Sequence, residues 1–203
     1  MIKAIIFDYY GVMCPRIVPI LSQKTSEQFG AAYEEVHRLM NKLLDRLDDD
    51  SITFQQYWEI LKAKLKNRNT KLSQHYKIWR SSALQLNLTP EMRNLSIRLK
   101  KSGYKVSLLT NVTKTMVKYN RMKGRYKLFR PVFLSCYLGT KKPSAKIYRH
   151  ALKKMRLKAK ECIFIDDQED YLKGAKSVGL NTILFKNASQ LRRELARAGV
   201  HGI

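Results

Sequence analysis

The chain has 203 residues, of which 44% are hydrophobic, so it can bury the core of one domain or of one domain that carries a smaller insert. Forty Lys and Arg residues against sixteen Asp and Glu residues give it a formal net charge of +24. It shows no solenoid-type repeat, no signal-peptide core and no apolar run of membrane-spanning length, so we expect a soluble cytoplasmic protein.

A short apolar run from Ala4 to Phe7 is the first predicted element. It predicts a central strand, because it is too short for a buried helix and contains β-branched residues. Asp8 follows directly, and Gly11 allows a sharp turn after it. The carboxyl ends of parallel strands are where α/β folds form ligand crevices, so Asp8 is a candidate catalytic residue. The plainer alternative is an Asp that only caps the turn.

The next segment, from residue 17 to residue 86, has helical periodicity and no strand-like run. Acidic residues at positions 48–50 interrupt the pattern, and Thr53 predicts the N-cap of a new helix. We therefore expect an all-helical cap, residues 17–86, inserted between two parts of an α/β core, residues 1–16 and 87–203.

After the insert, strands alternate with helices. This order indicates right-handed crossovers and a Rossmann-like parallel sheet with helices on both faces. The predicted strands are Lys105–Leu109, a run around Val132–Tyr137, Cys162–Ile165 and Thr182–Phe185, and the predicted helices include Ala145–Met155 and Ala188–Ala198.

Polar side chains follow several of these strands. Thr110 comes after the second strand and the pair Asp166 and Asp167 after the fourth, while Lys142 lies on a loop at the same edge. Together with Asp8 they suit phosphoryl transfer: acids to hold Mg²⁺, a carboxylate nucleophile, and Lys and Thr donors for phosphoryl oxygens. Each residue alone has a plainer explanation as a helix cap or a surface residue, but the combination favours one site.

Four segments resemble the motifs of the haloacid dehalogenase superfamily, in order IIFDYYGV, LLTN, KKPSAKIY and FIDDQEDYLKGAKSVGL. The resemblance covers essentially the whole chain, and the helical insert takes the position of that superfamily's cap. Within the superfamily the chain is most similar to the glucose-1-phosphatase-like phosphatases.

The resemblance implies a role for each motif residue. Asp8 would be the nucleophile that forms an aspartyl-phosphate, Thr110 would bind the phosphoryl group, and Lys142 would neutralise both. Mg²⁺ would be held by Asp8, the backbone carbonyl of Tyr10 and Asp167, with Asp166 as a further ligand or beside the ligands. The candidate site residues are thus Asp8, Thr110 and Lys142 for catalysis, Gly11 and Asn111 for substrate binding, and Asp8, Tyr10, Asp166 and Asp167 for the metal.

Two positions depart from the superfamily pattern. Tyr10 stands where its phosphatases usually have a second Asp as general acid, and a phenol with a pKa near ~10 is a poor replacement. Losing a general acid typically costs about 10² to 10⁴ in rate, which places efficient turnover in question. Glucose-1-phosphatase-like members also lack this Asp, and an anomeric phosphate leaves more easily than an alkyl one. Tyr171 replaces the usual Asn or Asp of the fourth motif, which affects support of the metal site rather than its ligands.

A Tyr two residues after the nucleophile is also found in the superfamily's haloacid dehalogenases. Those enzymes work without Mg²⁺ and lack an acidic pair like Asp166 and Asp167. In a metal-free crevice such carboxylates would repel one another and discourage an ionised Asp8. We therefore rank the dehalogenase interpretation below the phosphatase one.

Charge supports a further alternative. From Met92 to Lys160 there are 21 basic residues and no acidic one. Such a surface would concentrate small phosphorylated substrates and would bind nucleic acid non-specifically through phosphates, unless it is only a solvated Lys-rich surface. The main prediction is a Mg²⁺-dependent hydrolase of a small phosphorylated metabolite of the sugar phosphate class. The alternative is a catalytically weak or inactive protein of the same fold that binds RNA. The sequence identifies neither the substrate nor the oligomeric state.

Overall fold

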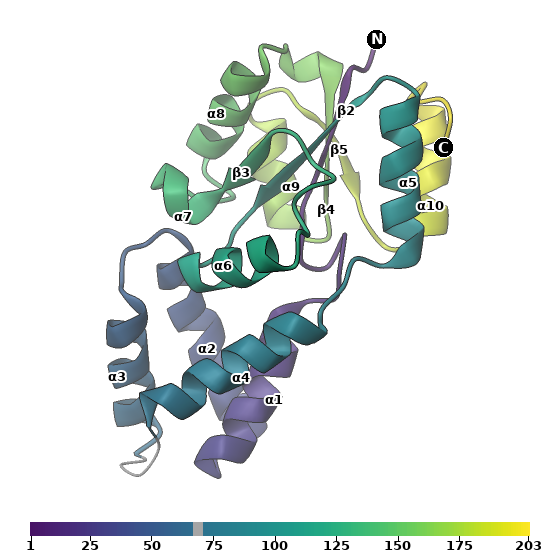
Figure 1. Cartoon of the computed structure of the whole chain (residues 1–203). Helices are drawn as coiled ribbons and strands as arrows, with labels where there is room; N and C mark the ends of the chain where they lie inside the picture. The colour runs from purple at the N-terminus through teal and green to yellow at the C-terminus, as the bar shows by residue number, and fades with distance from the viewer. Residues whose placement is uncertain (67–70) are drawn as a thin grey trace.

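The computed structural model describes residues 1–66 and 71–203, and Figure 1 shows a sheet flanked by helices with further helices below it. The strands are β1 (Ala4–Phe7), β2 (Lys105–Thr110), β3 (Val132–Leu134), β4 (Cys162–Asp166) and β5 (Asn181–Leu184). The helices are α1 (Ile17–Phe29), α2 (Tyr33–Asp48), α3 (Phe54–Lys64), α4 (Leu72–Gln85), α5 (Pro90–Lys101), α6 (Lys114–Met122), α7 (Ser135–Leu138), α8 (Ala145–Met155), α9 (Glu169–Lys176) and α10 (Ala188–Arg197), with a short 3-10 turn, Ala159–Glu161, before β4. No described helix is long and apolar enough to cross a membrane.

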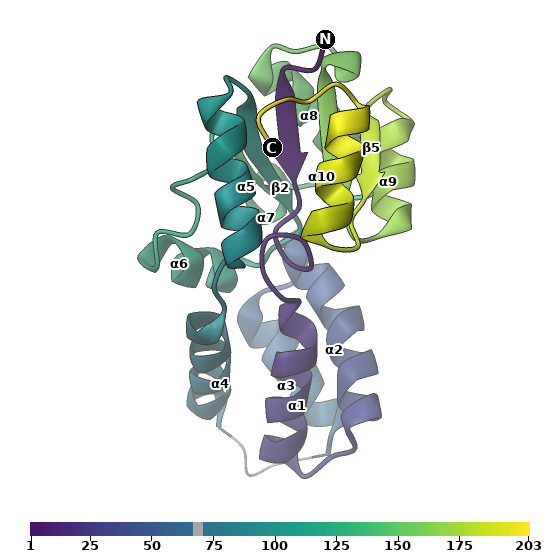
Figure 2. The ribbon, with the colours of Figure 1, turned by 90° about the vertical axis from the view of Figure 1, so that its right-hand side faces the viewer.

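The strands form one parallel sheet in the order β3-β2-β1-β4-β5, with β1 at its centre. Alternate residues of β1 point to opposite faces, as the period of a strand requires. Ile5 and Phe7 belong to the core shared with α5 and α10, whereas Ala4 and Ile6 pack with α8 and α9. Figure 2 shows α5 and α10 in front of the sheet and α8 and α9 behind it. The predicted α/β class with a parallel sheet covered on both faces is confirmed.

Helices α1 to α4, here called the cap helices, lie at the carboxyl edge of the sheet (Figures 1 and 2). All five strands lie outside residues 17–86, of which 67–70 are not among the described residues. We keep the division into a core, residues 1–16 and 87–203, and a helical cap as a proposal that this arrangement supports.

Aromatic side chains fill the interior of the cap helices. Tyr57, Trp58 and Trp79 are buried around His75, and the indole of Trp79 donates to His75 Nε2 at 3.1 Å. Burial lowers the pKa of His75 to about 3, so its ring is neutral and can accept this bond. The cluster therefore packs as a core, and its member Trp79 also borders a cavity at the edge of the sheet.

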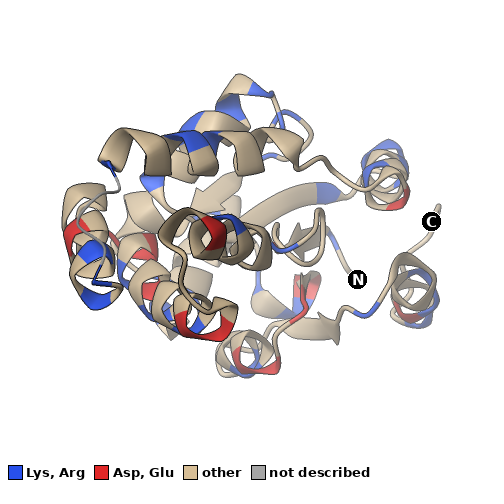
Figure 3. Ribbon diagram, turned by 90° about the horizontal axis from the view of Figure 1, so that it is seen from below, with Lys and Arg blue, Asp and Glu red and all other residues tan. Residues whose placement is uncertain are grey.

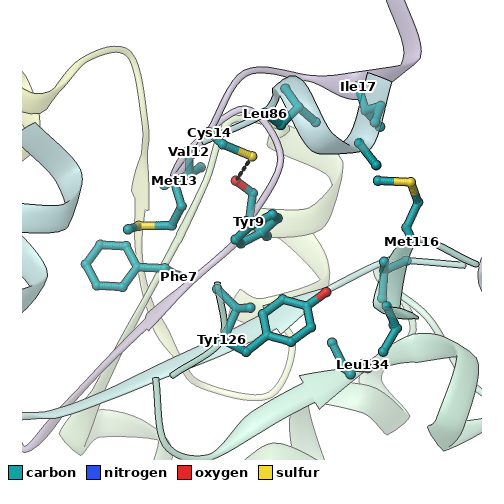
Figure 4. Packing of buried hydrophobic residues seen from close by; sticks show 14 of the residues in the cluster. Phe7, Tyr9, Val12, Met13, Cys14, Ile17, Leu86, Met116, Tyr126 and Leu134 are labelled. Atoms are coloured by element: carbon teal, nitrogen blue, oxygen red, sulfur yellow. Dashed lines mark hydrogen bonds between the residues drawn. The ribbon is translucent and has the colours of Figure 1, made fainter. Parts of the chain in front are cut away.

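The turn after β1 is fixed by packing on both sides (Figure 4). The ring of Tyr9 is fully buried and packs edge-on against Tyr126, with 5.6 Å between ring centroids. The thiol of Cys14 closes the turn by donating to the Tyr9 carbonyl at 3.7 Å. Because Asp8 precedes Tyr9 directly, this packing sets the position of its carboxylate.

The structure differs from the sequence prediction at the third strand. The strand expected around Val132–Tyr137 ends at Leu134, and Ser135 begins helix α7. The Ser135 hydroxyl accepts from the backbone N–H of Val112 at 3.0 Å and also donates to the carbonyl of Asp48. The first residue of α7 thus bonds a backbone N–H that follows β2 and a backbone carbonyl at the end of α2.

Helix α3 offers a test of the local interactions. Thr53 accepts from the Gln56 N–H at 3.1 Å and the Gln56 side chain returns a bond to the Thr53 N–H at 2.8 Å, forming a capping box. We expect Thr53→Ala to lower the free energy of unfolding by about 1 kcal/mol, measured by urea denaturation. Thr89→Ala is the matched control, because Thr89 occupies the N-cap of α5 without a side-chain hydrogen bond. Equal losses in the two variants would contradict the capping interpretation.

Candidate active site

Three neighbouring strands bring the predicted site residues to one edge of the sheet. Asp8 follows β1, Asp166 is the last residue of β4, and Asp167 comes next. Oxygen atoms of these three carboxylates lie within 4.8 Å of one another. Thr110, the last residue of β2, is buried at the same edge. The structure therefore brings together the strand-end residues that the sequence analysis singled out.

Lys142 lies between two of these carboxylates. Its Nζ is 2.7 Å from Asp8 Oδ1 and 2.6 Å from Asp166 Oδ2, and its side chain is only 1% exposed. Asn111 fixes the backbone of Lys142, since its amide donates to the Lys142 carbonyl at 3.0 Å and its Oδ1 accepts from the Lys142 N–H at 2.9 Å. The ring of Tyr171 covers the ammonium group, with its centroid 4.7 Å from Nζ. These contacts hold the positive charge at a single place.

Burial changes the ionisation of all three groups. It raises the pKa of Asp8 above the usual carboxyl value, although Lys142 opposes the change, and it raises the pKa of Asp166 to about 7. Burial also disfavours the charged form of Lys142, but the carboxylates of Asp166 and Asp8 outweigh it and raise the pKa of the lysine. Lys142 is therefore a permanent cation beside Asp8.

Asp167 has one satisfied and one unsatisfied oxygen. Arg16 Nε donates to Asp167 Oδ2 at 2.7 Å, whereas Oδ1 is buried and has no hydrogen-bond partner among the described residues. A buried carboxylate oxygen without a partner is costly, and Asp167 is one of the three clustered carboxylates. Oxygen donors grouped in this way fit a hard divalent cation such as Mg²⁺.

A cavity of about 280 Å³ opens between the sheet edge and the cap helices. Its floor contains Asp8, Thr110, Asn111, Lys142 and Tyr171. The residues that line it from the cap side, none of which the sequence analysis named as a site residue, include His37, Asn41, Leu44, Asp45, Asp48 and Trp79. They lie on helices whose periodicity shows which residues are buried but not which of them face the sheet. Gly11, a predicted substrate-binding residue, is not part of the lining and packs against Asp167 instead.

Tyr10 lines the cavity, but its hydroxyl is held by a hydrogen bond on the interior side. Its hydroxyl accepts from the amide of Asn120 at 2.8 Å, and the other end of that amide accepts from Arg125 at 3.0 Å. Burial raises the pKa of Tyr10 well above 10, so the phenol is a poor proton donor near neutral pH. Arg125 also donates to the Ala83 carbonyl at 2.7 Å, which joins this network to the end of α4.

Comparison with known families shows which family the chain belongs to. Residues 2–179 match the model of haloacid dehalogenase-like hydrolases. The chain belongs to the haloacid dehalogenase-like hydrolase family. Residues from all four motif segments of this hydrolase lie around one cavity, as the sequence resemblance predicted.

A protein of similar sequence agrees with this membership, and similar solved structures share the fold. A glyceraldehyde 3-phosphate phosphatase of Pyrococcus furiosus is 37% identical over 100 residues, which are 48% of this hydrolase and 41% of that protein, so the chain spans less than half of that relative. A haloacid dehalogenase-like hydrolase of Porphyromonas gingivalis has the same fold, with a TM-score of 0.76 at 20% identity and 99% coverage of both chains. A family member from Bacteroides thetaiotaomicron, solved with magnesium and inorganic phosphate, superimposes with a TM-score of 0.68 at 20% identity and covers 94% of this chain and 99% of its own.

Gly11 provides a test of how tightly the site is packed. It has φ +94°, and a Cβ there would lie 2.0 Å from Asp167 Oδ2. Gly103 has φ +88° but open space around the same position, so Gly103→Ala carries the strain of a positive φ without the clash. We expect Gly103→Ala to cost about 1 to 2 kcal/mol in free energy of unfolding and Gly11→Ala to cost clearly more, measured by urea denaturation. Equal costs would show that Asp167 moves aside freely.

Proposed function

We propose that this hydrolase is a Mg²⁺-dependent phosphatase that acts on a small phosphorylated metabolite through an aspartyl-phosphate on Asp8. The observation that carries the proposal is the buried ammonium of Lys142, held within 2.7 Å of Asp8 and beside a cluster of three carboxylates. A phosphoryl group bound here would contact the Asp8 nucleophile and the Lys142 cation, and it would lie beside the carboxylates that can hold a metal. This combination is what phosphoryl transfer requires.

Each residue has a distinct part in the proposed reaction. The Asp8 carboxylate attacks phosphorus, and Lys142 neutralises both the nucleophile and the phosphoryl oxygens. The Thr110 hydroxyl donates to the carbonyl of its neighbour Asn111 at 3.2 Å, and its single O–H would turn from that carbonyl to donate to a phosphoryl oxygen. The Asn111 amide keeps Lys142 in place through its backbone. Gly11 leaves the space that the Asp167 carboxylate occupies.

The proposed metal ligands are Asp8, the backbone carbonyl of Tyr10 and Asp167, with Asp166 beside them. The unpartnered Asp167 Oδ1 supports this assignment. When bound, Mg²⁺ supplies positive charge to the phosphoryl oxygens of the substrate. Arg16 pairs with the other oxygen of Asp167, Oδ2, at 2.7 Å and so orients that carboxylate.

The cavity supports a small polar substrate of the sugar phosphate class. A volume of about 280 Å³ fits a short metabolite rather than a large cofactor. His37, Asn41 and Asp45 offer donors and acceptors for hydroxyl groups, while Leu44 and Trp79 offer apolar walls. The curated relatives whose names describe phosphatases of a triose phosphate point in the same direction.

Two alternatives remain predictions of lower rank. The clustered carboxylates favour a metal-dependent reaction over the metal-free dehalogenase chemistry, because without a cation they would repel one another. Nucleic-acid binding rests on charge alone. Figure 3 shows Lys and Arg on all sides of the view rather than in one band.

The main proposal is tested by substitutions at the buried ion pair. Asp8→Asn removes the nucleophile and should abolish Mg²⁺-dependent release of phosphate from small phosphate monoesters, measured with and without a chelator. Lys142→Ala should lower the rate severely, because it leaves two buried carboxylates without their cation. Full activity in Asp8→Asn, with contaminating phosphatase excluded, would place the chemistry elsewhere.

The alternative is tested by direct binding. If the basic surface serves nucleic acid, a labelled single-stranded RNA should bind at about 50 mM salt and dissociate steeply as salt rises, because neutralised phosphates release counterions. Fluorescence anisotropy measures both effects. Absence of binding at low salt would leave the charge as a property of the surface.

A further inference from the structure

Four acidic residues lie at the C-terminal end of α2, and one of them differs from the others. Lys141 Nζ is 2.7 Å from Asp45 Oδ2 and 3.1 Å from Asp49 Oδ2, and Lys114 Nζ is 2.6 Å from Asp50 Oδ2. Within the described parts of the chain, no hydrogen bond or ion pair involves the carboxylate of Asp48. It is the one acid of this group that is both unpaired and part of the cavity lining.

The core holds this end of α2 in place over the site. The two lysines act on residues before and after Asp48, and the hydroxyl of Ser135 donates to the Asp48 carbonyl itself. Helix α2 packs beside α7 as a result, so the backbone of Asp48 is anchored to the carboxyl edge of the sheet. Its side chain lines the same cavity as Asp8 and Lys142. Asp48 is also close enough to Lys142 for the charge of that lysine to act on its carboxyl group, so a substrate in this cavity can contact both Asp8 and Asp48.

We propose that Asp48 transfers the protons of the reaction and so supplies the function that Tyr10 cannot perform; this inference rests on the proposed phosphatase activity. In the first step Asp8 forms a bond to phosphorus while the bond from phosphorus to the leaving oxygen breaks, and the Asp48 carboxyl gives its proton to that oxygen. In the second step the Asp48 carboxylate takes a proton from water, whose oxygen bonds to phosphorus as the bond to Asp8 breaks. Phosphate leaves, and both aspartates return to their starting states.

The surroundings of Asp48 suit this role. Burial raises its pKa to about 7, so protonated and ionised forms are both populated near neutral pH, as a residue that acts first as acid and then as base requires. Lysines next to the site oppose the effect and neighbouring aspartates add to it. The charged groups that act on Asp48 are Lys141, Asp45, Lys142 and Asp49.

The test compares leaving groups that do and do not need a proton. p-Nitrophenyl phosphate releases a stable anion, whereas propyl phosphate releases an alkoxide that must be protonated, and neither carries a hydroxyl for Asp48 to bind. We expect Asp48→Asn to lower kcat on propyl phosphate by about 10²- to 10⁴-fold. In the same variant, single-turnover release of p-nitrophenolate should change only a few-fold. Asp48→Glu, which keeps an acid, should recover part of the activity on propyl phosphate.

Asp49→Asn is the matched control, because Asp49 is the next residue, is paired with Lys141 and does not line the cavity. It should leave the ratio of the two rates unchanged. Equal losses on both substrates in Asp48→Asn, a rise in KM without a fall in kcat, or no loss at all would overturn the assignment. Asp8→Asn is run beside these variants. If it retains both activities, the proposed phosphatase mechanism fails, whereas a failure confined to Asp48 leaves that mechanism intact.

Discussion

The ion pairs of Lys142 with Asp8 and Asp166 are the interaction on which the site depends. Removing charges from water costs several kcal/mol for each ion, and only close pairing offsets this cost. Here one ammonium satisfies two carboxylates from adjacent strands, and Asn111 at the end of β2 fixes the backbone that carries it. The ends of β1, β2 and β4 are thus joined through Lys142. Its charge offsets the repulsion between the carboxylates of Asp8 and Asp166.

Much of this site could be predicted because the physics of a parallel sheet is visible in the sequence. Apolar runs followed directly by Asp8, Thr110 and Asp166 indicate polar groups at the ends of strands, and parallel strands bring those ends together. Lys142 was placed by its loop at the same edge. Although Thr110 and Asp166 prove to be the last residues of their strands rather than the first after them, this changes nothing in where their side chains meet.

The residues that line the cavity from the cap helices could not be predicted in this way. The acidic run near Asp48 indicates a break between helices, which is correct, but no local pattern distinguishes the unpaired acid from neighbours that bind lysines of the core. The same holds for the contact of Arg16 with Asp167, which joins residues far apart in the chain. Such contacts depend on how α1 and α2 pack on the sheet edge. Helical periodicity predicts burial but not the partner.

Lys141 and Lys142 are consecutive residues that serve different parts of the molecule. Lys141 reaches across to the aspartates at the end of α2, while Lys142 reaches down to the carboxylates at the ends of β1 and β4. A loss of one residue ahead of this pair would put Pro143 in the place of Lys142, and a gain of one residue would remove the lysine from the place of Lys141, so either change would leave one set of aspartates without its lysine. The length of the loop between Gly139 and Pro143 is consequently constrained by the contacts of both lysines. Other surface loops usually tolerate changes in length.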